Sequence, residues 1–89
     1  MADASIEQVV LEAQKGTETA LSELIELTQD RLFRFCMYLC GNPHLAQDIC
    51  QDVYIKALEK IGTLEDPKQF VSWLFSMARN LFIDHVRSP

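Results

Sequence analysis

Short groups of helix-breaking residues divide this sequence into four segments, and their positions constrain the fold more than any other feature. The breakers are Gly16, Gly41-Asn42-Pro43, Gly62 and Asp66-Pro67. Glycine often ends a helix in the left-handed conformation, and Asn or Asp followed by Pro is a typical helix start. The spacing predicts four helices, over approximately residues 5–15, 17–40, 43–61 and 67–87.

Apolar residues recur at helical spacing within the two segments that carry the clearest pattern. In the second segment they are Leu21, Leu24, Ile25, Leu32, Phe35, Cys36 and Leu39. In the fourth they are Phe70, Leu74, Met77, Ala78 and Leu81. Three glycines and three prolines in 89 residues are too few for a many-turned β fold, and no stretch alternates as a strand would. We predict an all-α fold, a compact bundle of about four helices in one domain, residues 1–89.

The cysteines do not indicate a disulfide framework, because there are three of them and their spacing is not dense. Zinc binding is one alternative, with ligands four residues apart and a fourth from elsewhere: Cys36, Cys40, His44, and Cys50 or His85. The break at Gly41-Asn42-Pro43 interrupts that spacing. We therefore interpret the cysteines as three buried free thiols of a protein in the reducing cytoplasm.

Nothing in the sequence indicates catalysis. Neither cysteine nor serine has the histidine and aspartate context of an activated nucleophile, and there is no glycine-rich phosphate loop. We predict no enzyme activity, no catalytic residue, no metal and no cofactor. The start of the chain lacks the basic stretch of a secretory signal, and its apolar runs are only a few residues long. These features predict a cytoplasmic protein without membrane insertion.

The distribution of charge matters more than its sum. A formal net charge of −5 argues against DNA binding, because proteins neutralise phosphates with Lys and Arg. However, residues 1–30 hold seven acids and one base, whereas residues 61–89 hold three of each. The acidic excess therefore belongs to the N-terminal third of the chain, and the rest is close to neutral.

The third segment carries an acidic face with an apolar residue at its centre. At about 100° per residue, Asp48, Asp52 and Glu59 fall within about 40° of one another, and Ile55 lies among them beside Gln51. An acidic rim around an exposed apolar residue is typical of a protein interface. The alternative is an ordinary solvated face with a stray isoleucine, which protein surfaces tolerate.

The fourth segment carries a polar face opposite its apolar stripe. Its members, with Trp73 at the edge, are Ser72, Ser76, Arg79, Asn80, Ile83, Asp84 and Arg87. Such side chains can hydrogen-bond to base edges, pair with phosphates and stack on an unpaired base. The alternative is a polar helix face with contacts among its own charged residues and a tryptophan that packs in the core.

Three stretches together resemble the second conserved domain (sigma2) of bacterial sigma factors, most closely the extracytoplasmic-function (ECF) class. Residues 48–54 resemble the family pattern D-x-x-Q-(D/E)-x-(F/Y), and residues 73–87 resemble W-L-x-x-x-A-R-N-x-x-x-D-x-x-R. Residues 31–35, Arg-Leu-Phe-Arg-Phe, resemble the segment that precedes them in the family. The likeness extends from about Leu21 to Arg87.

The resemblance implies a partner for each face. In this family the third helix docks on the clamp-helix coiled coil of the largest subunit of core RNA polymerase. This implies a polymerase set of five residues: Asp48, Gln51, Asp52, Ile55 and Glu59. The loop after it and the fourth helix read the minus-ten promoter element and hold a base flipped from the non-template strand. This implies a promoter set: Thr63, Leu64, Glu65, Asp66, Lys68, Ser72, Trp73, Arg79, Asn80, Asp84 and Arg87.

Two departures keep a second function open. A complete sigma factor of this class continues into a linker and a second DNA-binding domain, which are absent here, so we expect an isolated or truncated domain or a natural single-domain protein. The acidic net charge is also unusual for a DNA reader. The leading prediction is a transcription initiation specificity domain that binds core polymerase and melts the minus-ten element. The alternative is a sigma-like interaction module, bound by an anti-sigma regulator and without DNA reading of its own.

Overall fold

The computed structural model describes the backbone of residues 2–87 and the side chains of residues 6–87. These residues form four α-helices, with two single turns of 3-10 helix between the last two. The elements are α1 (Ala2–Gln14), α2 (Glu18–Cys40), α3 (Pro43–Lys60), η1 (Ile61–Thr63), η2 (Pro67–Gln69) and α4 (Phe70–Arg87). The described part of the chain contains no strand, and the prediction of an all-α bundle is confirmed.

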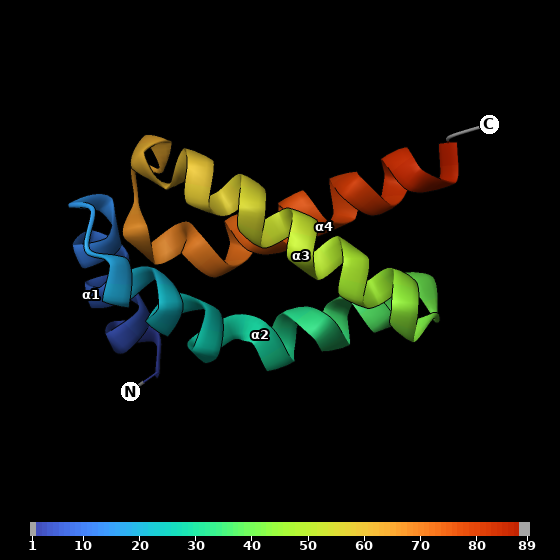
Figure 1. Ribbon diagram of the computed structural model, residues 1–89, viewed down its shortest axis with the longest axis horizontal. Helices are drawn as coiled ribbons and strands as arrows, with labels where there is room; N and C mark the ends of the chain where they lie inside the picture. The colour runs from blue at the N-terminus through green and yellow to red at the C-terminus, as the bar shows by residue number, and fades with distance from the viewer. Residues whose placement is uncertain (1, 88–89) are drawn as a thin grey trace.

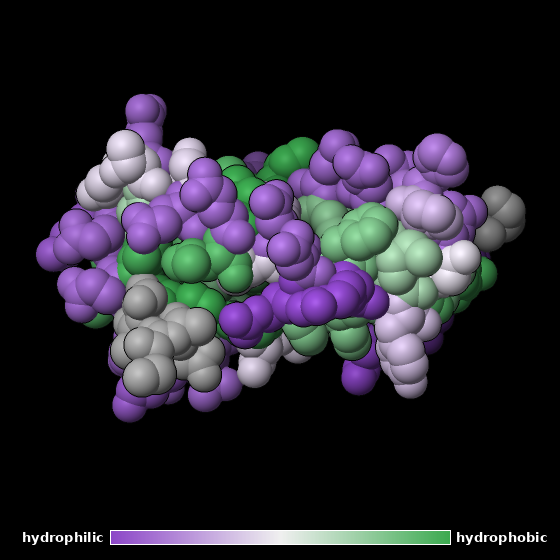
Figure 2. Space-filling model, turned by 90° about the horizontal axis from the view of Figure 1, so that it is seen from below, coloured by the Kyte–Doolittle hydropathy of each residue, from purple (hydrophilic) through white to green (hydrophobic). Residues whose placement is uncertain are grey.

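The bundle is elongated, with principal extents of 39 × 24 × 20 Å. The long helix α2 forms one side and packs against α1, α3 and α4 (Figure 1). Helix α1 lies across the end where α2 begins, and there it contacts both η1 and η2. Seen from the α2 side, hydrophilic side chains surround smaller apolar areas (Figure 2). The packing therefore holds the loop between η1 and η2 at the end of the bundle that α1 covers.

The helix ends follow the breakers, with differences of a few residues. Gly16 and Gly41 both have positive φ angles, of 94° and 64°, and the Gly41 amide donates to the Met37 carbonyl. Helix α1 begins at Ala2, before the predicted start at residue 5. The segment predicted as a helix from residue 67 begins instead with the 3-10 turn η2, because the amides of Gln69 and Phe70 donate to the carbonyls three residues before them, those of Asp66 and Pro67.

The core is made by one face of each helix. Its largest fully buried side chains include Val10, Leu24, Leu32, Val53, Phe70 and Leu74. The Phe35 and Phe75 rings stack with centroids 4.5 Å apart and join α2 to α4. Of the apolar residues predicted to form the α2 stripe, Leu24, Leu32 and Cys36 are buried and the others are half-buried. The sequence pattern missed Thr28, which is 1% exposed.

Candidate functional site

The polymerase set forms one exposed face of α3. Asp48, Gln51, Asp52, Ile55 and Glu59 are all exposed, and the Ile55 side chain is 58% exposed. The opposite face of the helix is buried through Ala46, Ile49, Val53 and Ala57. The prediction that Ile55 lies among carboxylates on the outside of this helix is confirmed. An exposed β-branched residue within a ring of acids gives this face an apolar centre and a negative rim.

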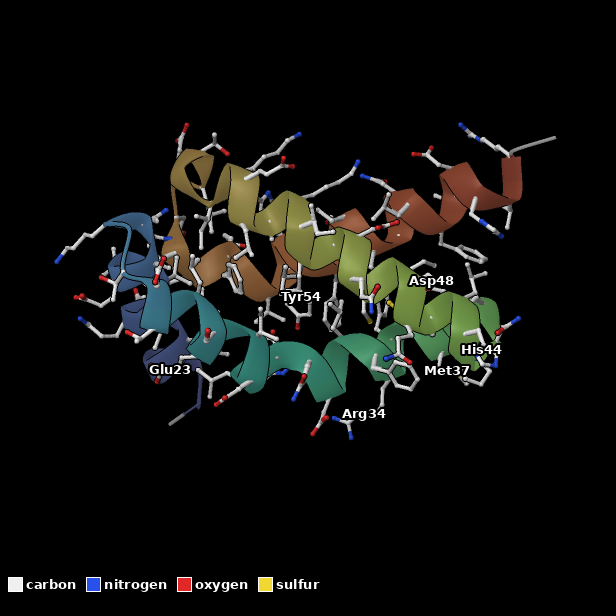
Figure 3. The ribbon with its side chains drawn as sticks, in the orientation of Figure 1. Glu23, Arg34, Met37, His44, Asp48 and Tyr54 are labelled. Atoms are coloured by element: carbon white, nitrogen blue, oxygen red, sulfur yellow. The ribbon has the colours of Figure 1, made fainter. Side chains whose placement is uncertain are left out.

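Two sets of hydrogen bonds hold α3 in place. At its start, the Asn42 side-chain oxygen accepts from the backbone amides of His44 at 2.9 Å and Leu45 at 3.2 Å. Near its middle, the Tyr54 hydroxyl lies 2.7 Å from the Thr28 hydroxyl on α2, and Figure 3 shows Tyr54 reaching from α3 toward α2. Thr28 also donates to the Leu24 carbonyl at 2.7 Å. The cap fixes where α3 begins, and the contact with Thr28 joins the middle of α3 to α2.

A groove of about 600 Å³ runs between α2 and α3 beside the polymerase set. Its lining is mixed, with apolar and polar side chains from both helices: Ile25, Gln29, Asp30, Phe33, Arg34, Gln47, Cys50, Gln51 and Tyr54. Burial raises the pKa of the Tyr54 hydroxyl, and the hydrogen bond with Thr28 opposes that effect in part. Gln51 is exposed on α3 and also lines the groove, so it belongs both to the polymerase set and to this groove.

On its other flank, α3 meets α4 at a smaller depression of about 160 Å³. Here Lys56 and Lys60 of α3 line the same hollow as Asn80 and Asp84 of the promoter set. Sequence reasoning missed the two lysines as site residues. Their four-residue spacing places them on one side of α3, but only the packing of α4 reveals that they adjoin Asn80. They add positive charge where the promoter set itself has little.

The loop half of the promoter set is tied to the protein by its own polar groups. The Thr63 hydroxyl donates to the Lys60 carbonyl at 2.6 Å, and the Asp66 carboxylate accepts from the Lys68 amide at 3.0 Å. The Gln14 side-chain amide on α1 donates to the Leu64 carbonyl at 2.8 Å and to the Ile61 carbonyl at 3.0 Å. Gln14 was also missed by sequence reasoning, because its partners are backbone groups about fifty residues away. The loop is held in one shape by α1.

The helix half of the promoter set is exposed, with one exception. Ser72, Arg79, Asn80, Asp84 and Arg87 are exposed, whereas Trp73 is half-buried. Its ring lies 6.0 Å from the Phe70 ring, tilted by 51°, and packs against the core. For Trp73 this geometry favours the packing alternative over a free stacking platform.

The promoter set does not converge on a single pocket. Ser72 and Lys68 line a hollow of about 490 Å³ with Arg31 and residues of α1, whereas Asn80 and Asp84 line the hollow shared with α3. The set extends along α4, an 18-residue helix about 27 Å long. Such an arrangement suits an extended polymer, such as a nucleic-acid strand, better than one small molecule.

The cysteines differ from their prediction in burial. All three are free thiols, but only Cys36 is buried, while Cys40 and Cys50 are half-buried. Cys40 reaches the surface near the end of α2, where its thiol donates to the Cys36 carbonyl at 3.0 Å. Cys50 is half-buried because it lies on the edge of α3 that borders the groove. In the described part of the chain, no three His, Cys, Asp or Glu side chains are grouped closely enough to hold a metal ion.

Known proteins match this chain over the same helices. The model of sigma-70 region 2 matches residues 24–88, which contain both the polymerase set and the promoter set. The chain belongs to the sigma-70 region 2 family. Its resemblance to the ECF class is confirmed by relatives of that name. The relatives of this sigma-70 region 2 chain are sigma factors rather than enzymes, in agreement with the prediction.

Three of these relatives illustrate the likeness. The ECF RNA polymerase sigma factor SigW of Bacillus subtilis (strain 168) is 30% identical over 82 residues, covering 92% of this chain and 44% of that protein. BldN of Streptomyces coelicolor is 33% identical over 82 residues, covering 91% and 31%. SigM of Bacillus subtilis is 33% identical over 67 residues, covering 75% and 40%. The sigma-70 region 2 chain therefore spans less than half the length of each of these relatives.

The family match adds a structural point about α1. It begins at Leu24, so α1 and the Gln14 side chain lie outside the matched region. Gln14 nevertheless holds the loop that carries part of the promoter set. No helix within the described residues of this sigma-70 region 2 domain is both long and apolar enough to cross a membrane.

Proposed function

We propose that this chain is a transcription initiation specificity domain that docks on core RNA polymerase through the polymerase set. The observation that carries the proposal is the exposed α3 face, with Ile55 58% exposed at its centre and three carboxylates around it. An apolar centre with a charged rim suits a protein partner, since the centre contributes burial and the rim contributes orientation. The proposed partner surface is the clamp-helix coiled coil of the polymerase largest subunit.

The acidic rim gives the docking step a recognisable electrostatic character. Negative charges at Asp48, Asp52 and Glu59 attract a basic surface and raise the rate of association at low ionic strength. Because these side chains are exposed, salt screens them over about 10 Å at 0.1 M. Association with core polymerase is therefore expected to slow as salt is added, with a smaller change in dissociation.

The promoter set is the proposed contact to the non-template strand of the minus-ten element. Lys68, Arg79 and Arg87 are exposed and supply positive charge for phosphates, while Asn80 and Ser72 supply hydrogen-bonding groups for bases. The fixed loop around Leu64 is the proposed edge of a pocket for an extruded base, which offsets the few kcal/mol that unstacking costs. Lys56 and Lys60 are added to this proposed surface because they line the hollow beside Asn80.

Docking is tested by titrating labelled chain with core polymerase. Asp52→Arg and Ile55→Glu are expected to weaken binding at least about tenfold, a loss of about 1.4 kcal/mol, with unchanged helicity. Matched controls are Glu26→Arg and Leu27→Glu, which make the same changes of charge and polarity at exposed positions of α2. Equal affinity for all four variants and the parent would remove the polymerase set from the interface.

The alternative function is a sigma-like interaction module held by an anti-sigma regulator. The net charge of −5 favours it, as do the Thr63 and Asp66 side chains, which already have partners within the loop. Crosslinking separates the two proposals. Photoreactive non-template minus-ten oligonucleotides are expected to label residues 63–73 in the polymerase complex. A complex that binds the chain but gives no such label would favour the interaction module.

A further inference from the structure

Two cysteine sulfurs meet where α2 packs against α3. The Sγ atoms of Cys36 and Cys50 are 3.6 Å apart, within hydrogen-bonding distance for sulfur. Cys36 is fully buried, with 0% exposure, whereas Cys50 is half-buried and lines the groove between the two helices. The Cys50 thiol is therefore accessible to a small molecule from solvent, and the Cys36 thiol is buried next to it.

The two thiols also differ in acidity. The hydrogen bond with Cys50 and burial raise the pKa of Cys36, whereas the same hydrogen bond lowers the pKa of Cys50 below its usual value. When the pair loses one proton, Cys36 keeps its hydrogen and donates it to the Cys50 thiolate. The more accessible sulfur is thus also the better nucleophile, because the thiolate is the reactive form of cysteine.

We propose that Cys50 and Cys36 are an oxidation site that forms a reversible intramolecular disulfide with a hydroperoxide as the oxidant. The thiolate of Cys50 attacks one peroxide oxygen, so that an S–O bond forms, the O–O bond breaks and hydroxide leaves. Cys50 becomes a sulfenic acid. The Cys36 sulfur then attacks the Cys50 sulfur, the S–S bond forms, and the departing hydroxide takes the Cys36 proton as water. Overall, two thiols and one hydrogen peroxide give one disulfide and two waters.

The geometry supports this pairing rather than the other possible ones. The two sulfurs are already in contact at 3.6 Å, and the disulfide bond brings them to about 2.05 Å. Cys40 lies one helical turn beyond Cys36, but its thiol contacts the carbonyls of Cys36 at 3.0 Å and Asn42 at 3.4 Å. Cys40 is therefore directed toward the backbone at the end of α2, and it serves as the control thiol.

The test uses the whole 89-residue chain, treated with hydrogen peroxide and assayed by thiol counting, intact mass and peptide mapping. Free thiols are expected to fall from three to one, and the mass by about 2 Da as two hydrogens are lost. The mapped linkage joins Cys36 to Cys50, and dithiothreitol restores all three thiols. The Cys40→Ser variant is expected to form the same disulfide at the same rate, whereas Cys50→Ser forms none.

A fourth variant detects the intermediate. Cys36→Ala removes the resolving sulfur, so the Cys50 sulfenic acid is expected to persist and to be trapped by dimedone. If this core substitution prevents folding, linkage mapping of the parent chain alone decides the question. A disulfide that maps to Cys40, dimers linked between chains, or no thiol loss in the folded parent would each overturn the proposal. None of these measurements depends on polymerase or DNA binding, so their outcome is separate from the proposed function.

Discussion

The Gln14 side chain on α1 donates to the backbone carbonyl of Leu64 at 2.8 Å, across 50 positions of sequence. The same amide group also donates to the Ile61 carbonyl at 3.0 Å. One half-buried side chain thus satisfies two backbone acceptors in the turn between α3 and α4. The shape of this turn, which carries the loop half of the promoter set, depends on a helix outside the matched family region.

Substitution of Gln14 by Ala is expected to destabilise the chain by about 1–3 kcal/mol, since two hydrogen bonds are lost and the Leu64 carbonyl needs a new partner. The Ile61 carbonyl still accepts from the Leu64 amide at 3.2 Å. Urea unfolding measures the loss. Hydrogen exchange is expected to accelerate mainly over residues 61–66, because the remaining helices keep their packing. Gln8→Ala is the matched control, as Gln8 is exposed on the same helix. Equal stability of the two variants would mean that the bonds from Gln14 do not hold the turn.

The pair Thr28 and Tyr54 is expected to behave as one unit. The Thr28 and Tyr54 hydroxyl oxygens are 2.7 Å apart, and either of them can donate. Thr28 also contacts the Leu24 carbonyl at 2.7 Å. Tyr54→Phe is expected to cost about 1 kcal/mol of unfolding free energy. Thr28→Val, which keeps the shape of the side chain, removes the same bond. The double variant is therefore expected to cost clearly less than the sum of the singles, as a double-mutant cycle measures. Additive losses would contradict the coupling.

The sequence predicted the positions of the helices well, but it predicted the contacts between them less well. The breakers and the helical period placed α2, α3 and the outward face around Ile55, because both signals are local. Thr28 has the same four-residue spacing as the buried Leu24 and Leu32, but it was missed as a core residue because its side chain is polar. Lys56 and Gln14 were missed because their neighbours lie on other elements. Their roles follow from where α4 and α1 pack, and side-chain periodicity within one helix does not contain that information.

The helix cap at Asn42 gives a prediction for local stability. Its side chain accepts from two amides at the start of α3, which would otherwise lack partners. Asn42→Ala is expected to lower the unfolding free energy by about 1 kcal/mol, whereas Asn42→Asp keeps an acceptor and most of the stability. Thermal or urea unfolding distinguishes the two. Losses of equal size in both variants would show that the amide group of Asn42, rather than its acceptor oxygen, matters.

Tyr54 gives a prediction for high pH. Burial raises the pKa of its hydroxyl above the usual value of 10.0. In a Tyr38→Phe variant Tyr54 is the single tyrosine, so its ionisation can be followed alone. Its phenolate is expected to form at a higher pH in the folded chain than in urea. The unfolded chain then loses this proton first. The contribution of Tyr54 to the unfolding free energy is fully present below pH 10 and falls as the pH rises above it. It levels off once Tyr54 also ionises in the folded chain.

The stability measurement separates Tyr54 from the other groups that ionise in this range. Tyr54→Phe has no phenol at this position, so its stability is expected to decline less steeply above pH 10 than that of the parent chain. The slopes are compared rather than the absolute values, because the substitution also removes the hydrogen bond to Thr28. Parallel slopes for the parent and the variant would contradict the burial of the Tyr54 hydroxyl between α2 and α3.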